Sequence, residues 1–148
     1  MTRAASDYDI KILNSLIETT LASADGYSKA AVEAENAAYR SLFEQWAHER
    51  RQVVDDLQGQ LRALGGTQRS GALSEPVVFL NLGGLRCDDN SMLLAVEMGE
   101  DLIRSMYEEA LDDEVMSSDV RTAVMRAYSS VRSGDDQARE LKLSLRRY

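Results

Sequence analysis

The chain has 148 residues, of which 44% are hydrophobic and 28% charged, the size and composition of a single domain with an ample core. Its formal net charge of −8 repels polyanions, so we expect neither nucleic acid nor a membrane among its partners. The single cysteine excludes an intrachain disulfide, the N-terminal residues lack the apolar segment of a secretion signal, and no apolar run is as long as a membrane span. We therefore predict one cytoplasmic domain over residues 1–148.

The first predicted helix begins near Ser6 or Asp7, either of which can cap it. Its residues form a mostly apolar stripe that repeats every seven residues, which is typical of a helix packed at a shallow angle in a bundle. One row of the stripe holds Ile10, Ile17, Ala24 and Ala31, and the other holds Leu13, Thr20, Tyr27 and Ala34. The stripe changes phase near residues 35–37, where Asn36 can cap a second helix. Because neither Gly nor Pro marks this break, one longer helix is the alternative.

The second predicted helix ends at Gly65-Gly66, a strong C-terminal signal, and a long connection over residues 67–91 follows. Within it, residues 77–85 include the apolar run Val77, Val78, Phe79 and Leu80. These are too many apolar side chains for a solvated loop, so we predict that they form the interface of a homodimer. Alternatively, the run covers one end of a monomeric bundle.

The third predicted helix covers about residues 91–111, and the fourth begins after Ser117-Ser118 and reaches almost to the C-terminus. The third is strongly acidic and the fourth is basic, so we expect their charges to be complementary in an antiparallel pair. Four helices and almost no strand-like alternation predict an all-α fold. A connection as long as 67–91 can span a bundle, which favours a four-helix bundle with one long crossover between helices 2 and 3.

Four polar residues fall near the middle of the predicted helices: Thr20, Arg50, Glu100 and Asp135. Arg50 lies in the apolar row of Phe43 and Leu57, where an unpaired charge is costly. We therefore predict a buried polar layer in which Arg50 pairs with Glu100, Asp135 or both. The alternative is that Arg50 extends to solvent and the acids face water. Gly134 lies in a core row at the same level, which predicts close helix packing there or, alternatively, room for a small ligand.

No residue pattern in the chain indicates catalysis or cofactor binding. His48 is the only histidine, and it lies on the helical face opposite Phe43 and Leu57. Cys87 is followed by two aspartates, which disfavour a reactive thiolate. We therefore predict no catalytic residue, no cofactor and no tightly bound metal.

Several short motifs agree in order and spacing with a known group of proteins. They are residues 12–19, Asp25-Gly26-Tyr27, Leu42-Phe43, Gly99-Glu100-Asp101 and Tyr107. Over roughly residues 7–147 the chain resembles small bacterial ferritin-like four-helix-bundle proteins of unassigned function, which are distant relatives of rubrerythrin.

The resemblance implies a di-iron site that this chain has largely lost. Thr20 stands where the related sequences have a Glu, and their Glu-x-x-His on the second helix falls on Arg50 and Val53. Glu100 matches a retained carboxylate, whereas the fourth-helix site falls at Gly134 and Asp135 without a histidine. The resemblance thus predicts a non-catalytic structural or interaction protein, associated with stress, that keeps a degenerate metal site. The alternatives are a di-iron oxidase or peroxidase of the rubrerythrin type and a small-molecule binder in the bundle core.

Overall fold

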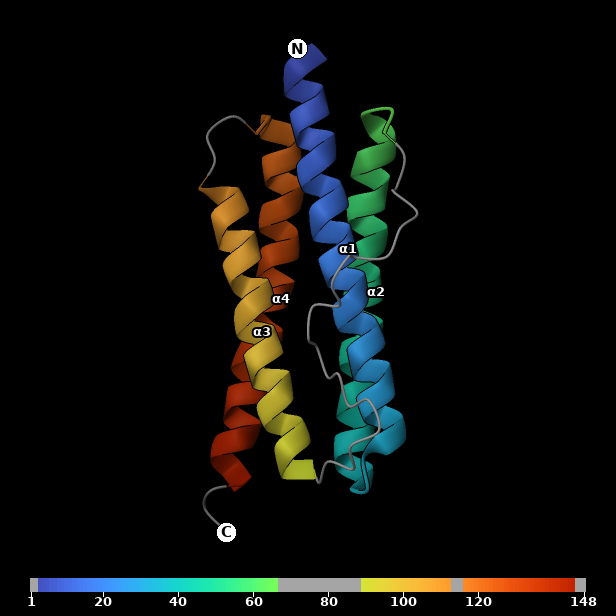
Figure 1. Cartoon of the computed structure of the whole chain (residues 1–148), viewed down its shortest axis with the longest axis vertical. Helices are drawn as coiled ribbons and strands as arrows, with labels where there is room; N and C mark the ends of the chain where they lie inside the picture. Colours follow the sequence, from blue (N-terminus) through green and yellow to red (C-terminus); the bar gives the residue numbers. More distant parts are fainter. Residues whose placement is uncertain (1–2, 67–88, 113–115, 146–148) are drawn as a thin grey trace.

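The computed structural model describes residues 3–66, 89–112 and 116–145, and at 3–6, 89–95, 97, 135, 138, 142, 144 and 145 it describes the backbone alone. These ranges form α1 (Arg3–Glu33), α2 (Ala37–Ala63), α3 (Asp89–Leu111) and α4 (Ser118–Leu145). The helices pack against one another as a four-helix bundle, so the predicted all-α fold is confirmed (Figure 1). None of the described helices contains a stretch long and apolar enough to cross a membrane.

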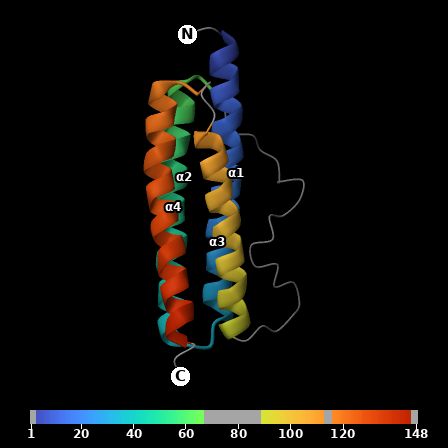
Figure 2. The ribbon, with the colours of Figure 1, turned by 90° about the vertical axis from the view of Figure 1, so that its left-hand side faces the viewer.

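The order of the helices around the bundle explains how the chain connects them. α1 packs along α2 and α3 along α4, while α2 also contacts α4 and α1 also contacts α3. In Figures 1 and 2, α1 and α4 run in one direction and α2 and α3 in the other, so these neighbouring pairs are antiparallel. α2 and α3 are therefore parallel and lie at diagonal corners. Because α2 ends at the opposite end of the bundle from the start of α3, the chain crosses its length between them, as predicted.

Both ends of α2 are set by residues that the sequence marks. Asn36 Oδ1 accepts hydrogen bonds from the backbone N–H groups of Ala38 at 2.8 Å and Tyr39 at 3.3 Å, so the helix is capped where the stripe changes phase. At the other end Gly65 has a φ of +77°, and the Gly66 N–H donates to the Leu61 carbonyl at 3.0 Å. This left-handed glycine ends the helix, as expected. The predicted turn is confirmed, and the single longer helix is wrong.

A buried carboxylate lies at the end of the bundle where α4 begins. Asp9 on α1 is fully buried, and its Oδ1 accepts from the Ser117 N–H at 3.3 Å. A negative charge beside the first turn of a helix is stabilised by the partial positive charge of its free N–H groups. Asp9 therefore joins the start of α1 to the start of α4, which the sequence pattern did not predict.

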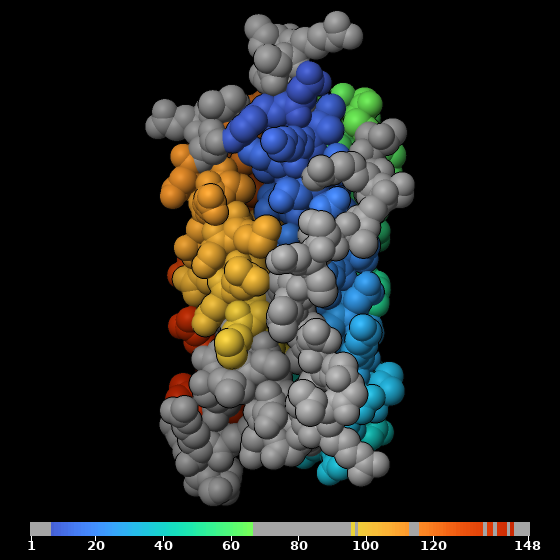
Figure 3. All heavy atoms as spheres, viewed as in Figure 1, coloured from blue at the N-terminus to red at the C-terminus, as the bar shows by residue number. Residues whose placement is uncertain are grey.

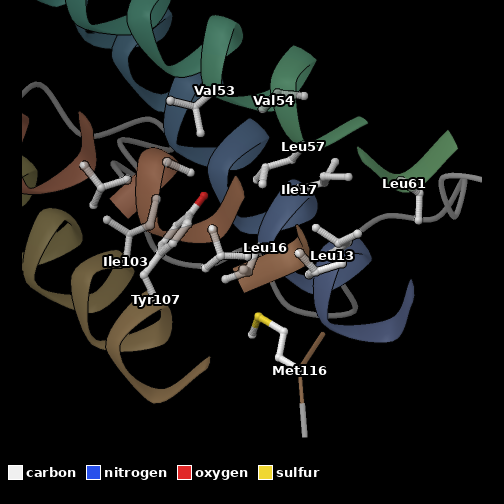
Figure 4. Packing of buried hydrophobic residues seen from close by; sticks show 14 residues of the cluster. Leu13, Leu16, Ile17, Val53, Val54, Leu57, Leu61, Ile103, Tyr107 and Met116 are labelled. Atoms are coloured by element: carbon white, nitrogen blue, oxygen red, sulfur yellow. The ribbon is translucent and has the colours of Figure 1, made fainter. Parts of the chain in front are cut away.

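The core consists of two clusters along the bundle. The aliphatic cluster, toward the N-terminus of α1, contains Leu13, Leu16, Ile17, Val53, Val54, Leu57, Leu61, Ile103, Tyr107, Met116, Val120, Val124, Ala127 and Val131 (Figure 4). The aromatic cluster, toward the C-terminal end of α1, contains Tyr27, Ala30, Ala31, Ala34, Tyr39, Phe43, Trp46, Ala47 and Val96. The buried side chains of Thr20, Arg50 and Glu100 lie along their helices between the residues of the two clusters.

Candidate functional site

An ion pair crosses the middle of the bundle between two diagonal helices. Nη2 of Arg50 on α2 donates to Oε2 of Glu100 on α3, and the side chains are only 3% and 0% exposed. The hydroxyl of Tyr27 on α1 donates to the other carboxylate oxygen, Oε1. Both oxygens of Glu100 are therefore engaged, by partners from two other helices.

The fourth helix provides the space that the guanidinium occupies. A Cβ added at Gly134 would lie 2.6 Å from Arg50 Nη2 and 3.5 Å from Glu100 Oε2. The carbonyl oxygen of Val131, one turn earlier, lies 3.5 Å from the same Nη2. The close helix packing expected at Gly134 thus takes a different form, because the missing side chain makes room for Arg50. Nη1 of Arg50 has no hydrogen-bond partner among the described residues.

Arg50 remains a cation in this setting. Burial on its own lowers the pKa of Arg50, because a desolvated guanidinium loses its hydration. The negative charge of Glu100, its hydrogen bond and the nearby tyrosines act in the opposite direction, and the pKa of Arg50 ends above its ordinary value. The Cζ atom also lies 5.9 Å from the centre of the Tyr27 ring, within the range of a cation–π contact.

A second polar contact lies one heptad along the bundle from Tyr27 and Glu100. The Thr20 hydroxyl donates to the Leu16 carbonyl at 2.6 Å, which uses its single proton. The Tyr107 hydroxyl, 2.6 Å from Thr20 Oγ1, is therefore the donor in the contact between them. Burial raises the pKa of Tyr107 to about 12, although the Thr20 hydroxyl and the charge of Arg50 oppose the shift. The phenol is neutral across the physiological range.

The structure brings together part of the predicted polar layer. Arg50, Glu100 and Thr20 are all buried, and Arg50 pairs with Glu100, whereas Thr20 bonds to Tyr107 in a neighbouring layer. The side chain of Asp135 and the predicted interface at Val77, Val78, Phe79 and Leu80 lie outside the described residues. The alternative in which Arg50 extends to solvent is wrong.

Sequence reasoning did not predict that Tyr27, Tyr107 and Gly134 would act around the ion pair. Tyr27 and Tyr107 occupy heptad positions, which indicate burial but do not say where a hydroxyl points. Gly134 was assigned to helix packing. The useful signal was the coincidence of Arg50, Glu100 and Gly134 at one level, because a buried long side chain needs space on a facing helix.

The donor set around Glu100 does not fit a di-iron centre. Such a centre takes carboxylates from all four helices together with two histidines. Among the described side chains, Glu100 contributes the one carboxylate, both of its oxygens are used, and the Arg50 guanidinium lies against it. Across the described residues no group of three or more His, Cys, Asp or Glu side chains is placed to hold a metal ion.

The other charged groups that were singled out lie on the surface. His48 is exposed, with its Nε2 3.3 Å from the Gln52 side-chain nitrogen. Between α3 and α4, Arg139 pairs with Asp101 at 3.2 Å. The Glu108 carboxylate accepts from Tyr128 at 2.8 Å and Arg104 at 2.9 Å, and these bonds lower the pKa of Glu108. The acidic and basic helices are therefore complementary, with surface pairs that contribute little to stability.

A protein-family model described as "Domain of unknown function (DUF2383)" matches residues 9–113. The match runs from the first part of α1 to the residues just after α3 and includes Tyr27, Arg50 and Glu100. Gly134 on α4 lies outside it. No curated protein matches the chain.

Proposed function

The chain belongs to the DUF2383 family, and within this family of unknown function we propose that it acts without catalysis, as a ferritin-like structural or interaction protein. The observation that carries the proposal is the buried pair of Arg50 with Glu100. A metalloprotein of this architecture neutralises its central carboxylates with metal ions. Here a protein cation does so, which supports a bundle that folds without a metal and has no reactive centre.

The arrangement of the helices supports a ferritin-like relationship, because one-crossover bundles of that class also place their second and third helices parallel. The resemblance to rubrerythrin relatives supports three further parts of the proposal: a bacterial origin, a place in the cytoplasm and an association with stress. A homodimer formed by Val77, Val78, Phe79 and Leu80 is the proposed assembly, supported by the apolar character of that run. Sedimentation of the double variant Val78→Asp, Phe79→Asp tests it, since a dimer held elsewhere would persist.

Metal analysis tests the non-catalytic proposal. The purified protein is incubated separately with Fe(II), Mn(II) and Zn(II), desalted, and its metal content per chain is measured. We expect far less than one ion per chain, because Glu100 has no free oxygen to offer. The His48→Ala variant is the matched control, since it removes the one imidazole from the surface and corrects for binding there.

Near-stoichiometric metal that is lost in a Glu100→Gln variant would overturn the proposal and favour the di-iron oxidase or peroxidase. The degenerate-site idea has its own test in Arg50→Glu, which replaces the cation with a second carboxylate beside Glu100. This variant should be less stable than the wild type, and Mn(II) or Zn(II) should raise its melting temperature while leaving that of the wild type unchanged. A different outcome would favour a small-molecule binder in the bundle core: a small organic molecule that raises the melting temperature of the wild type but not that of the Gly134→Ala variant.

A further inference from the structure

A cleft of about 270 Å³ lies between α1 and α3, which are side by side on the face shown in Figure 3. Tyr8, Ile12 and Ser15 line it from α1, and Met106, Glu109 and Ala110 from α3. Leu16, which is 2% exposed, also contributes to its lining. The Thr19 hydroxyl donates to the Ser15 carbonyl at 3.0 Å, and its oxygen lies 3.6 Å from the Met106 sulfur, so this side chain lies against α1. The cleft is thus an open recess whose surface is polar and apolar in equal parts.

The apolar surface continues from the cleft along α3. Met98 and Leu102 are 66% and 45% exposed, and they precede Met106 by eight and four residues. Residues four apart lie on one face of a helix, about 6 Å along its axis. A ligand with its polar end at Glu109 therefore finds an apolar track leading away from it, past Met106 toward Leu102.

The cleft is lined by one charged side chain among the described residues, the negative Glu109. It lies at the C-terminal end of α3, where free carbonyl groups carry partial negative charge and no basic residue stands in the last turn. Glu109 is exposed and pairs with no described residue, whereas Glu108 is bonded to Arg104 and Tyr128. The nearby cations are Arg121, which donates to the Leu111 carbonyl at 2.7 Å, and Lys11, which is exposed on α1.

We propose that this cleft binds a small alkylammonium ion, with its aliphatic chain against Ile12, Met106 and Leu102 and its ammonium group against Glu109. The cleft volume is close to the lower limit of about 300 Å³ for ligand pockets, which suits a compact molecule. The site is separate from the buried ion pair. It goes beyond the proposed function and does not depend on it.

Three six-carbon probes of nearly equal shape test the proposal: hexylamine, 1-hexanol and hexanoate, which at pH 7 are a cation, a neutral molecule and an anion. Each is titrated into the ¹⁵N-labelled full chain at one ionic strength while amide shifts are followed. Hexylammonium should bind about two- to fivefold more tightly than hexanol, and hexanoate most weakly, as an exposed ion pair implies. The shifts should be concentrated at residues 8–16 and 102–110. Equal affinities for the three probes, or shifts centred elsewhere, would overturn the proposal.

Matched variants separate a specific site from the general negative field. Glu109→Gln should abolish the preference for hexylammonium over hexanol while hexanol still binds. Asp112→Asn removes the same charge from the same end of α3 without lining the cleft, so it should keep the preference. Ala110→Trp should weaken all three probes by filling the recess. An equal loss of preference in Glu109→Gln and Asp112→Asn would show that only the overall charge matters. If Ala110→Trp does not fold, the wild-type shift map still decides where the probes bind.

Discussion

The aliphatic and aromatic clusters fill the same bundle by different means. In the aliphatic cluster, branched side chains from all four helices interlock around Leu57, which is fully buried. In the aromatic cluster, three rings contact one another, with Trp46 at 5.5 Å from Tyr27 and 5.8 Å from Phe43 between ring centroids, both near edge-to-face. Ala30, Ala31, Ala34 and Ala47 leave the room for these rings. The two clusters therefore differ in the chemistry of the side chains that fill them.

The difference explains where a charge can be buried. The rings of the aromatic cluster carry polar groups at their edges: Tyr27 donates to Glu100, and Trp46 Nε1 donates to the Gln137 side-chain oxygen at 2.7 Å. Branched aliphatic side chains have no such groups. The ion pair of Arg50 and Glu100 therefore lies beside the aromatic cluster, where its carboxylate finds a second donor. In the aliphatic cluster, Tyr107 makes a neutral contact with Thr20. The buried Asp9 lies beyond it, at the end of the bundle, where it accepts from the Ser117 N–H.

The largest expected effect comes from breaking the ion pair on one side. Arg50→Met should lower the free energy of unfolding by about 3–5 kcal/mol, because Glu100 is left as an unpaired charge in the core. Urea unfolding followed by circular dichroism measures the change. The double variant Arg50→Met, Glu100→Gln should recover most of the loss, since neither charge then remains. An equal loss in both variants would mean that the volume of Arg50, and not its charge, is what matters.

Leu57→Ala should have the next largest effect, about 2–5 kcal/mol, from a cavity in the aliphatic cluster. Trp46 is the one tryptophan, and it lies in the other cluster, so its fluorescence reports that region alone. The native emission of Leu57→Ala should match that of the wild type, whereas Phe43→Leu should shift it. A shifted emission in Leu57→Ala would contradict the independence of the two clusters.

The sequence predicted the fold well because the fold depends on periodicity and caps. Two heptad rows per helix specify a bundle, and Asn36 and Gly65 mark the ends of α2 by local chemistry. The site was harder to predict. Arg50 in an apolar row required a partner, and Glu100 was among the acids at its level, but heptad position does not fix where a side chain points. Tyr27 was therefore missed, Thr20 was placed one layer away from its partner, and Asp9 was not noticed.

Alkaline pH should lower the free energy of unfolding through the buried Tyr107 of the aliphatic cluster. Burial raises the pKa of Tyr107 to about 12, above its ordinary value near 10, so the native state keeps a proton that the unfolded chain loses. The resulting contribution is complete below pH 10 and is lost as the pH rises toward 12. It amounts to about 2–3 kcal/mol at most. Unfolding by urea at pH 9 and pH 11.5 measures the decline, with Tyr107→Phe as the control. The same decline in both proteins would assign it to other groups.

The smallest expected effect tests how the fourth helix contributes to the ion pair. Gly134→Ala places a methyl group 2.6 Å from Arg50 Nη2, which forces the guanidinium away from Glu100 and should lower the free energy of unfolding by about 1–3 kcal/mol. Alanine is otherwise the better helix former, so Gly134→Ala would stabilise the protein if helix propensity were its only effect. In the Arg50→Met background the nitrogen is absent, and Gly134→Ala should become neutral or stabilising. This change of sign in a double-mutant cycle would show that Gly134 acts by making room for Arg50. An equal loss in both backgrounds would mean that Gly134 serves helix packing, and that the room for Arg50 comes from elsewhere.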